Sequence, residues 1–226
     1  MKRFAVPLVA LVLAGIPALA GADALRPPDG TYHYELRHGG TVAGTSTLVF
    51  HTDAGTLSVV DETQLTIFTL KAHATASYAT SDLHLTGYAA DVTLPTAVQH
   101  TDVVPSPGHM KVSVGAQQVD IAADASAPLE ILSDNFGGTT MMIPAEMLAA
   151  NATRATFAVL SGGLAVVASV ASGTPPARPD GIPARDNALA VNAGPLELIF
   201  WYDPATVVVD AVVIPAQGAE FRRVDH

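Results

Sequence analysis

The feature that most constrains the fold is a two-residue alternation of apolar and polar side chains that recurs along the chain. Tyr32, Tyr34 and Leu36 share one parity, and polar residues occupy the positions between them. This period is typical of a β-strand with one face buried and the other in water. Short segments that favour turns separate the alternating runs, as at His38-Gly39-Gly40. The pattern predicts an antiparallel meander of long strands.

One stretch, residues 128–151, interrupts the strand pattern. Pro144 suits the first turn of a helix, because proline lacks the N–H group that is unsatisfied there. The residues from Ala145 to Ala150 favour helix, so we expect a helix over residues 144–151, preceded by a turn at Gly137-Gly138. The predicted fold class is mainly β: a single antiparallel curved sheet or half-barrel meander, with one short central helix packed on it.

The last strong hairpin, residues 196–214, is apolar on both parities, with apolar residues in succession from Leu198 to Trp201. Such a run indicates strands that are covered on both sides, and we expect the sheet on one side and the helix on the other. Residues 220–224 are interpreted as an edge strand that is guarded by its two arginines. The proline-rich segment 173–187 predicts an exposed loop.

The first 24 residues have the pattern of an export signal, in which a positively charged start precedes an apolar run. Small-residue cleavage patterns end at Ala20 and at Ala24, so the exported protein is expected to start at Gly21 or Leu25. The apolar run is shorter than the ~20 residues of a membrane span. Ala22 stands where a lipidated cysteine would have to be. The predicted location is therefore the periplasm or the extracellular space, with no membrane anchor after cleavage.

Residues 25–226 are expected to form a single β-rich domain that rests on its own core, because the chain contains no cysteine for disulfides. The formal charge is −10, and it becomes −12 when Lys2 and Arg3 are removed with the signal. This acidic balance argues against nucleic acid and against anionic membrane surfaces as partners.

No catalytic motif in the sequence is complete. Ser133-Asp134-Asn135 matches one β-lactamase motif, but the Ser-x-x-Lys and Lys-Thr-Gly companions are missing. The sequence also lacks a nucleophile elbow, a His-Glu-x-x-His motif, a phosphate loop and a dinucleotide fingerprint. No cofactor is expected, and the interpretation leans toward a non-enzymatic protein. Two alternatives stay open: a hydrolase whose carboxylates or histidines converge only in three dimensions, and a purely structural module.

The histidines form the one cluster that suggests a metal. His33 shares a strand face with Glu35, and His73 shares one with Lys71. With suitable strand alignment, His33, Glu35, His73 and one further ligand would make a metal site. The positive charge of Lys71 opposes a cation, and histidine is also at home on a solvent-facing sheet. We therefore expect no bound metal.

Several of these features occur together in one known class of proteins. They are the export signal, the Tyr32-x-Tyr34-x-Leu36 strand, the Gly39-Gly40 turn, Gly44 in the next strand and the late Trp201-Tyr202-Asp203 hairpin. The chain resembles uncharacterised secreted bacterial β-proteins, and its plan is similar to that of periplasmic lipoprotein-carrier proteins. The resemblance implies a curved sheet around an apolar cavity and a non-enzymatic role in binding an apolar ligand, such as a lipid, or an envelope partner. Those carriers contain more helix than is expected here, and no residue role is transferred.

The residues expected to line an apolar pocket lie in the central stretch and in the late hairpin. Two adjacent methionines beside a Gly-Gly turn give an adaptable apolar surface, and strands that are apolar on both faces need a cover that one short helix provides only in part. The predicted ligand-binding residues are Phe136, Met141, Met142, Met147, Leu148 and Trp201. The predicted partner is a hydrophobic small molecule or an envelope protein. The alternative is that these side chains fill a dry core.

Overall fold

Fifteen strands of one sheet and a single α-helix make up the part of the chain that this computed structural model describes, residues 24–66, 69–134, 137–160, 164–171 and 177–225. The strands before the helix are β1 (Gly30–His38), β2 (Thr41–Asp53), β3 (Thr56–Leu65), β4 (Leu70–Ala79), β5 (Leu85–Leu94), β6 (Ala97–Ser106), β7 (His109–Val114), β8 (Gln117–Ala122) and β9 (Glu130–Ser133). The helix α1 (Gly137–Ala149) is followed by β10 (Arg154–Val159), β11 (Leu164–Val170), β12 (Asn187–Ala193), β13 (Leu196–Tyr202), β14 (Val209–Ile214), the 3-10 turn η1 (Pro215–Gln217) and β15 (Ala219–Arg223).

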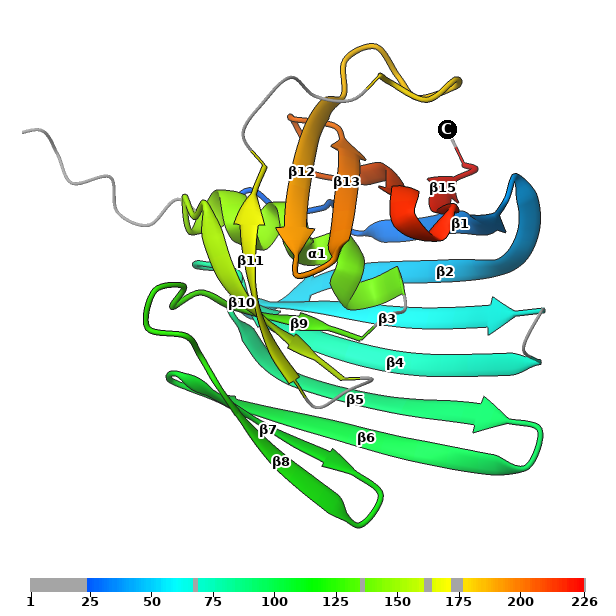
Figure 1. Cartoon of the computed structure of the whole chain (residues 1–226). Coiled ribbons are helices and arrows are strands. Elements are labelled where there is room, and N and C mark those ends of the chain that lie inside the picture. The colour runs from blue at the N-terminus through cyan, green and yellow to red at the C-terminus, as the bar shows by residue number, and fades with distance from the viewer. Residues whose placement is uncertain (1–23, 67–68, 135–136, 161–163, 172–176, 226) are drawn as a thin grey trace, which may run out of the picture.

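The strands lie in the order β8-β7-β6-β5-β4-β3-β2-β1-β15-β14-β13-β12-β11-β10-β9 (Figure 1). Neighbouring strands are antiparallel except β9 and β10, which pair in parallel, so the sheet is mixed. The helix contacts β2, β3 and β4 on one side of the order and β9 and β14 on the other. The sheet therefore curls around the helix, and the predicted fold class of one curved sheet with one helix packed on it is confirmed.

The helix begins at Gly137 rather than at Pro144, which lies inside it, and ends at Ala149. The expected turn at Gly137-Gly138 was therefore wrong. The signal for the true start lies far away in the sequence: the carboxylate of Asp61 on β3 accepts the N–H of Gly138 at 2.8 Å. An acceptor from another element thus caps the helix in place of a local capping residue.

The two glycines are needed because the start of α1 lies very close to the sheet. A Cβ atom added to Gly137 would stand 2.7 Å from Ser46 Oγ on β2, which is closer than any ordinary contact. A Cβ added to Gly138 would stand 3.1 Å from Asp61 Cβ. Glycine here permits close approach of backbone to sheet, a role that sequence alone does not distinguish from a turn.

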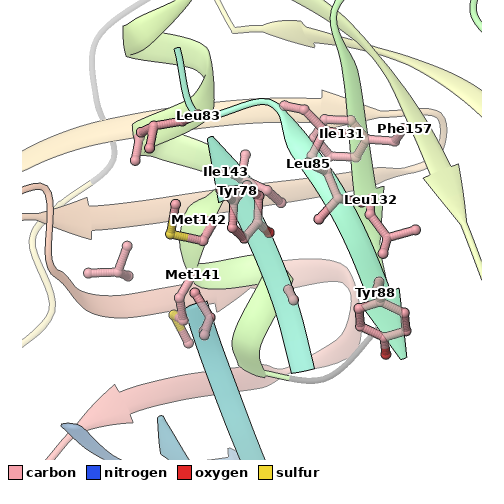
Figure 2. Packing of buried hydrophobic residues seen from close by; sticks show 14 of the residues in the cluster. Tyr78, Leu83, Leu85, Tyr88, Ile131, Leu132, Met141, Met142, Ile143 and Phe157 are labelled. Atoms are coloured by element: carbon pink, nitrogen blue, oxygen red, sulfur yellow. The ribbon is translucent and has the colours of Figure 1, made fainter. Parts of the chain in front are cut away.

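The core lies between α1 and the concave face of the sheet. Figure 2 shows Met141, Met142 and Ile143 of the helix beside Tyr78 and other buried side chains. All residues of the helix from Gly137 to Met147 are buried. Burial on all sides explains how the helix tolerates an internal proline and carries no amphipathic pattern, because packing rather than helix propensity holds it.

The late strands are buried on both faces, as predicted, but the face away from the helix is covered by the segment around Ile182 and not by sheet. Leu198 and Phe200 of β13 belong to the main core, whereas Ile199 and Trp201 point to the other side of the sheet. There they join a second group of buried side chains, here called the outer cluster: Ile182, Ile199, Trp201 and Ala211. Ile182 shows that part of the proline-rich segment covers this face, so the expected exposed loop is only partly exposed.

The last strand, β15, is not an edge strand. It pairs with β1 on one side and with β14 on the other, so it joins the two ends of the chain inside the sheet. The prediction of a guarded edge was wrong because a strand's own sequence does not reveal its neighbours. Its arginines serve as internal partners instead: Arg223 bonds to Asp210 at 3.0 Å, and Arg222 donates to the carbonyl oxygen of Asp180 at 2.8 Å.

The predicted export signal, residues 1–24, lies outside the described residues except for Ala24. Among the residues that are described, no helix has the length and apolar character needed to cross a bilayer.

Candidate ligand-binding cavity

Three of the predicted pocket residues come together in the main core. Met141, Met142 and Met147 are all at most 2% exposed. They project from α1 into the space between the helix and the sheet. The structure thus brings the three methionines together, among close-packed side chains.

The other predicted pocket residues lie elsewhere. Trp201 belongs to the outer cluster, on the opposite face of the sheet from α1. Leu148, near the end of the helix, is 46% exposed, and Phe136 lies outside the described residues. The five described residues therefore do not surround one common space.

A cavity of about 730 Å³ lies next to this core, on the inner side of the sheet. Its wall is formed by β1, β2 and β3 on one side and by strands β9 to β15 on the other, with Thr140 of α1 at its inner end. None of the five predicted pocket residues that the structure describes forms part of this wall. The cavity lies where the two halves of the curled sheet face each other, next to the first turn of the helix.

Most of the cavity wall is apolar. Phe157 and Leu198 are at most 8% exposed and belong to the main core, whereas Leu164 is 61% exposed. Further apolar side chains come from neighbouring strands, among them Leu36, Val159, Val166 and Phe221. A buried base with an exposed leucine in its wall indicates a space that opens to solvent.

The charged residues that border the cavity are already paired, and their side chains lie on the opposite face of β1 and β15 from the core residues Leu36 and Phe221. Arg37 bonds to Glu35 at 2.6 Å, and Glu220 bonds to Arg222 at 2.6 Å. Arg37 and Glu220 also stand opposite each other across β1 and β15. These four groups cancel one another's charge, so the rim does not select strongly for a charged ligand. His38 also lines the rim.

A polar anchor holds the start of α1 beside the cavity. Asp61 accepts hydrogen bonds from Ser46 Oγ at 2.9 Å and Thr63 Oγ1 at 2.7 Å, in addition to the helix N–H. Burial raises the pKa of Asp61, and the hydrogen bonds from Thr63, Gly138 and Ser46 oppose that rise. The anchor fixes the helix position and with it the inner end of the cavity.

Two other acids lie buried near the helix. Tyr88 donates to the carboxylate of Asp134 at 3.1 Å, and Glu146 is only 2% exposed. Burial raises the pKa of Glu146 well above its ordinary value, which favours the neutral acid. Neither of these acids forms part of the cavity wall. Asp134, from the partial β-lactamase motif, is thus a core residue.

His33 and His73, the two histidines of the suggested metal site, lie exposed on the convex face. His33 is on β1 and His73 is on β4. Two strands separate them, so the two histidines are too far apart to bind one metal ion together. Within the described residues, no group of three or more His, Cys, Asp or Glu side chains is arranged to hold a metal. The expectation that the protein binds no metal stays a prediction.

Instead, three histidines form a row with two acids and a threonine across six neighbouring strands. Strand register places these side chains opposite one another in the order His33, Thr47, Glu62, His73, Asp91 and His100. His73 Nδ1 lies 2.6 Å from Glu62 Oε1, and His100 Nδ1 lies 2.7 Å from Asp91 Oδ1. Such cross-strand pairs stabilise a solvent-facing sheet.

Comparison with known proteins supports the architecture. The sequence matches no family profile and no curated protein. The fold is similar to the crystal structure of a β-barrel-like protein of a domain of unknown function, DUF1849, from Brucella abortus. That structure has a TM-score of 0.50 and 12% identity, and the match covers 88% of this chain and 96% of that chain. The likeness shows the fold alone, which agrees with the expected class of uncharacterised β-proteins.

The sequence contained only a weak signal for the cavity. Its wall is distributed over ten strands, with one or two side chains from most of them. Inward-facing parity was visible for Leu36, but not for Leu198, whose strand is apolar on both parities. The gap they face depends on how the two halves of the sheet are spaced, which no local pattern encodes.

Proposed function

We propose that this is an exported, non-enzymatic protein that binds an uncharged apolar small molecule, or the apolar part of a larger one, in the cavity between the two halves of the sheet. The observation that carries the proposal is the cavity itself, about 730 Å³ with a mainly apolar wall. Binding sites for small molecules typically measure about 300–1,000 Å³ and are lined by apolar side chains with few polar groups.

The electrostatics of the wall support an uncharged ligand. The two charged residues that border the cavity, Arg37 and Glu220, already have ion-pair partners, Glu35 and Arg222. A ligand charge would have to compete with these pairs. The plan of a curved sheet around a short helix also agrees with the resemblance to lipoprotein carriers, for which an acyl chain is the natural apolar moiety.

The hydrolase alternative has less support. Glu220 is the acidic residue that borders the cavity, and its side chain pairs with Arg222 on the outer face of the sheet. Hydrolysis by paired carboxylates needs a second acid at a suitable distance across the substrate. The buried acids Asp61, Asp134 and Glu146 do not line the cavity.

A titration with the neutral dye Nile red tests the proposal. The wild-type protein should bind the dye saturably, with one site per chain. Val166→Phe should abolish this binding, because Val166 forms part of the cavity wall. The matched control is Val167→Phe, which places the same ring on the other face of β11, since side chains alternate along a strand.

Folding of both variants is checked by circular dichroism. If Val166→Phe does not fold, Leu164→Glu replaces it, because Leu164 is 61% exposed and its loss should leave the core intact. Equal dye binding by the wild type, a folded cavity variant and the control would refute the proposed site.

Export is a separate part of the proposal, supported by the signal-like pattern of residues 1–24. N-terminal sequencing of protein recovered from a bacterial envelope fraction should give a start at Gly21 or Leu25. An intact Met1 on that material would contradict export with cleavage.

A further inference from the structure

Residues 177–186, here called the strap, lie over the outer cluster. The guanidinium of Arg178 stands 5.0 Å from the centre of the Trp201 ring, a distance at which a cation is attracted to an aromatic face. The same guanidinium donates hydrogen bonds to the carbonyl oxygens of Pro183 and, at 3.0 Å, Asp186. One side chain therefore both holds the strap's shape and stacks it on the tryptophan.

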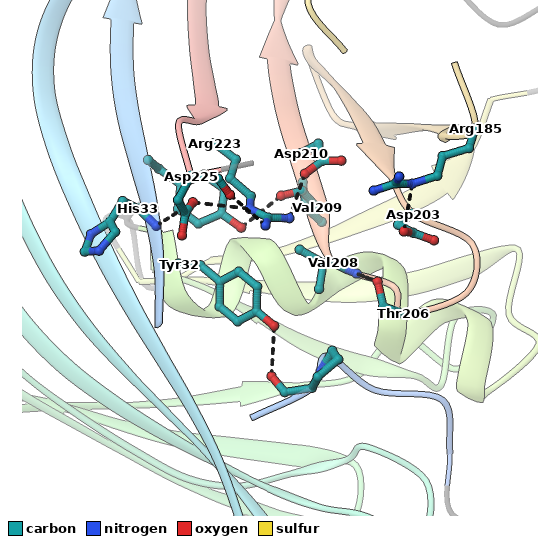
Figure 3. Close-up of polar contacts among 12 residues, drawn as sticks. Tyr32, His33, Arg185, Asp203, Thr206, Val208, Val209, Asp210, Arg223 and Asp225 are labelled. Carbon is teal, nitrogen blue, oxygen red and sulfur yellow. Dashed lines mark hydrogen bonds and ion pairs between the residues drawn. The ribbon is translucent and has the colours of Figure 1, made fainter. Parts of the chain in front are cut away.

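Further contacts tie the strap to the strands beneath. Arg222 donates to the carbonyl oxygen of Asp180 at 2.8 Å. Figure 3 shows the second contact, in which Arg185 donates to the carboxylate of Asp203 at 3.0 Å. Ile182 inserts into the outer cluster and is 7% exposed. The strap is thus part of the cover that leaves Trp201 only 4% exposed.

The strap ends at a buried pair of carboxyl groups. Asp186 is 3% exposed and immediately precedes β12, and Asp210 on β14 is fully buried. Asp210 is the extra residue where the register of β13 and β14 shifts between Trp201 and Tyr202. A bulge of this kind redirects a side chain, and here it brings the buried carboxyl of Asp210 close enough to that of Asp186 to raise the pKa of Asp186.

The two acids differ in their other partners. Arg223 donates to Asp210 at 3.0 Å (Figure 3). Neither oxygen of Asp186 accepts a hydrogen bond from a nitrogen or hydroxyl donor in the described part of the chain. Two buried carboxyl groups in contact do not both ionise readily, so one proton is shared between them. Burial first, and then Asp210, raise the pKa of Asp186 to about 7.

Other charged groups near the pair also act on the pKa of Asp186, but less strongly than burial and Asp210 do. The positive charge of Arg185 favours ionised Asp186, and the negative charge of Asp203 opposes it. On the far side of Asp210, the charged and titratable neighbours of its partner Arg223 are Tyr34 and Asp225.

We propose that this carboxyl pair is a proton-operated clasp, which holds the strap on the sheet while the two acids share a proton and releases the strap when that proton leaves. Release uncovers the outer cluster, including Trp201. The clasp makes the exposure of this apolar face depend on pH, independently of whether the inner cavity binds a ligand.

The direction follows from proton linkage. The carboxyl of Asp186 binds its proton more tightly with the strap closed than with the strap released, where its ordinary value of 3.8 applies. The closed strap is therefore most stable in acid, and it loses stability as pH rises from about 4 to about 7. Above that range, repulsion between the two carboxylates is complete.

Acrylamide quenching of Trp201 measures the release, because Trp201 is the chain's one tryptophan. In the full chain, quenching should be weak at about pH 4.5 and stronger at about pH 8, near the two ends of the range over which the closed strap loses stability. Far-UV circular dichroism should stay constant between the two, which separates strap release from unfolding of the sheet.

Asp186→Asn is the decisive variant, because an amide donates to Asp210 and does not ionise. Its quenching should stay weak at both pH values. Asp180→Asn, which removes an exposed acid from the same strap, should titrate like the wild type. Quenching that does not change with pH in the wild type, or that changes equally in the wild type and Asp186→Asn, would overturn the proposal.

Discussion

The two halves of the sheet are buried in different ways. In the first half, strands β2 to β5 bury one face against the core and expose the other, which carries the row of histidines and acids. In the second half, β13 and β14 are covered on both faces, by the core within and by the strap outside. The difference shows that a two-residue alternation in the sequence reports which faces of a strand meet water. A strand that is buried on both faces, such as β13, is regular in structure but has no such alternation in its sequence.

The largest expected effect comes from removing cover in the second half. Ile199→Ala should lower the free energy of unfolding by about 2–5 kcal/mol, the usual cost of truncating a buried isoleucine, because Ile199 is 5% exposed beneath the strap. Val60→Ala, on the half-exposed outer face of β3, should cost roughly 1 kcal/mol or less. Urea unfolding of both variants measures the difference, and equal costs would show that the strap does not protect its face.

A smaller effect is expected from the helix anchor in the first half. Asp61→Ala should lower the free energy of unfolding by roughly 2–4 kcal/mol, because Ser46, Thr63 and Gly138 lose their shared acceptor in a buried site. Glu62→Ala, one residue further on the exposed face, should cost less than about 0.5 kcal/mol. Thermal unfolding compares the pair. A small cost for Asp61→Ala would mean that packing alone positions the helix.

The burial of the first half of the sheet was visible in the sequence, whereas the start of α1 and the position of β15 were not. The first half was predictable because each strand there reports its own burial, from Tyr32 and Leu36 onward. The start of α1 was not, because its cap, Asp61, is supplied by another element. β15 was taken for an edge for a similar reason: its two partners come from distant parts of the chain.

The candidate site was the least predictable part. The methionines of α1 are apolar and adaptable, yet they lie in the core at most 2% exposed. Trp201 lies on the other face, because the odd residues of β13 point away from the helix. The cavity depends on the separation of the two sheet halves, a property of the assembled fold.

The smallest expected effect concerns the row of histidines on the convex face of the first half. The hydrogen bond to Asp91 first, and then the charge of Asp102, raise the pKa of His100 above its ordinary value. A raised histidine value favours the folded state in acid, and this contribution disappears as pH rises through the folded value. NMR titration should show a lower value for His100 in Asp91→Asn than in the wild type. An unchanged value would show that the pair does not persist in solution.

In the proposed complex, an apolar ligand lies between the two sheet halves and not in the methionine core. Methyl NMR during a titration with Nile red distinguishes the two positions. Saturable shifts are expected for Val159, Val166 and Leu198, which line the cavity, while Met142 and Met147 of the core keep their positions. Shifts confined to the methionines, or no saturable shift at any cavity methyl group, would contradict the account.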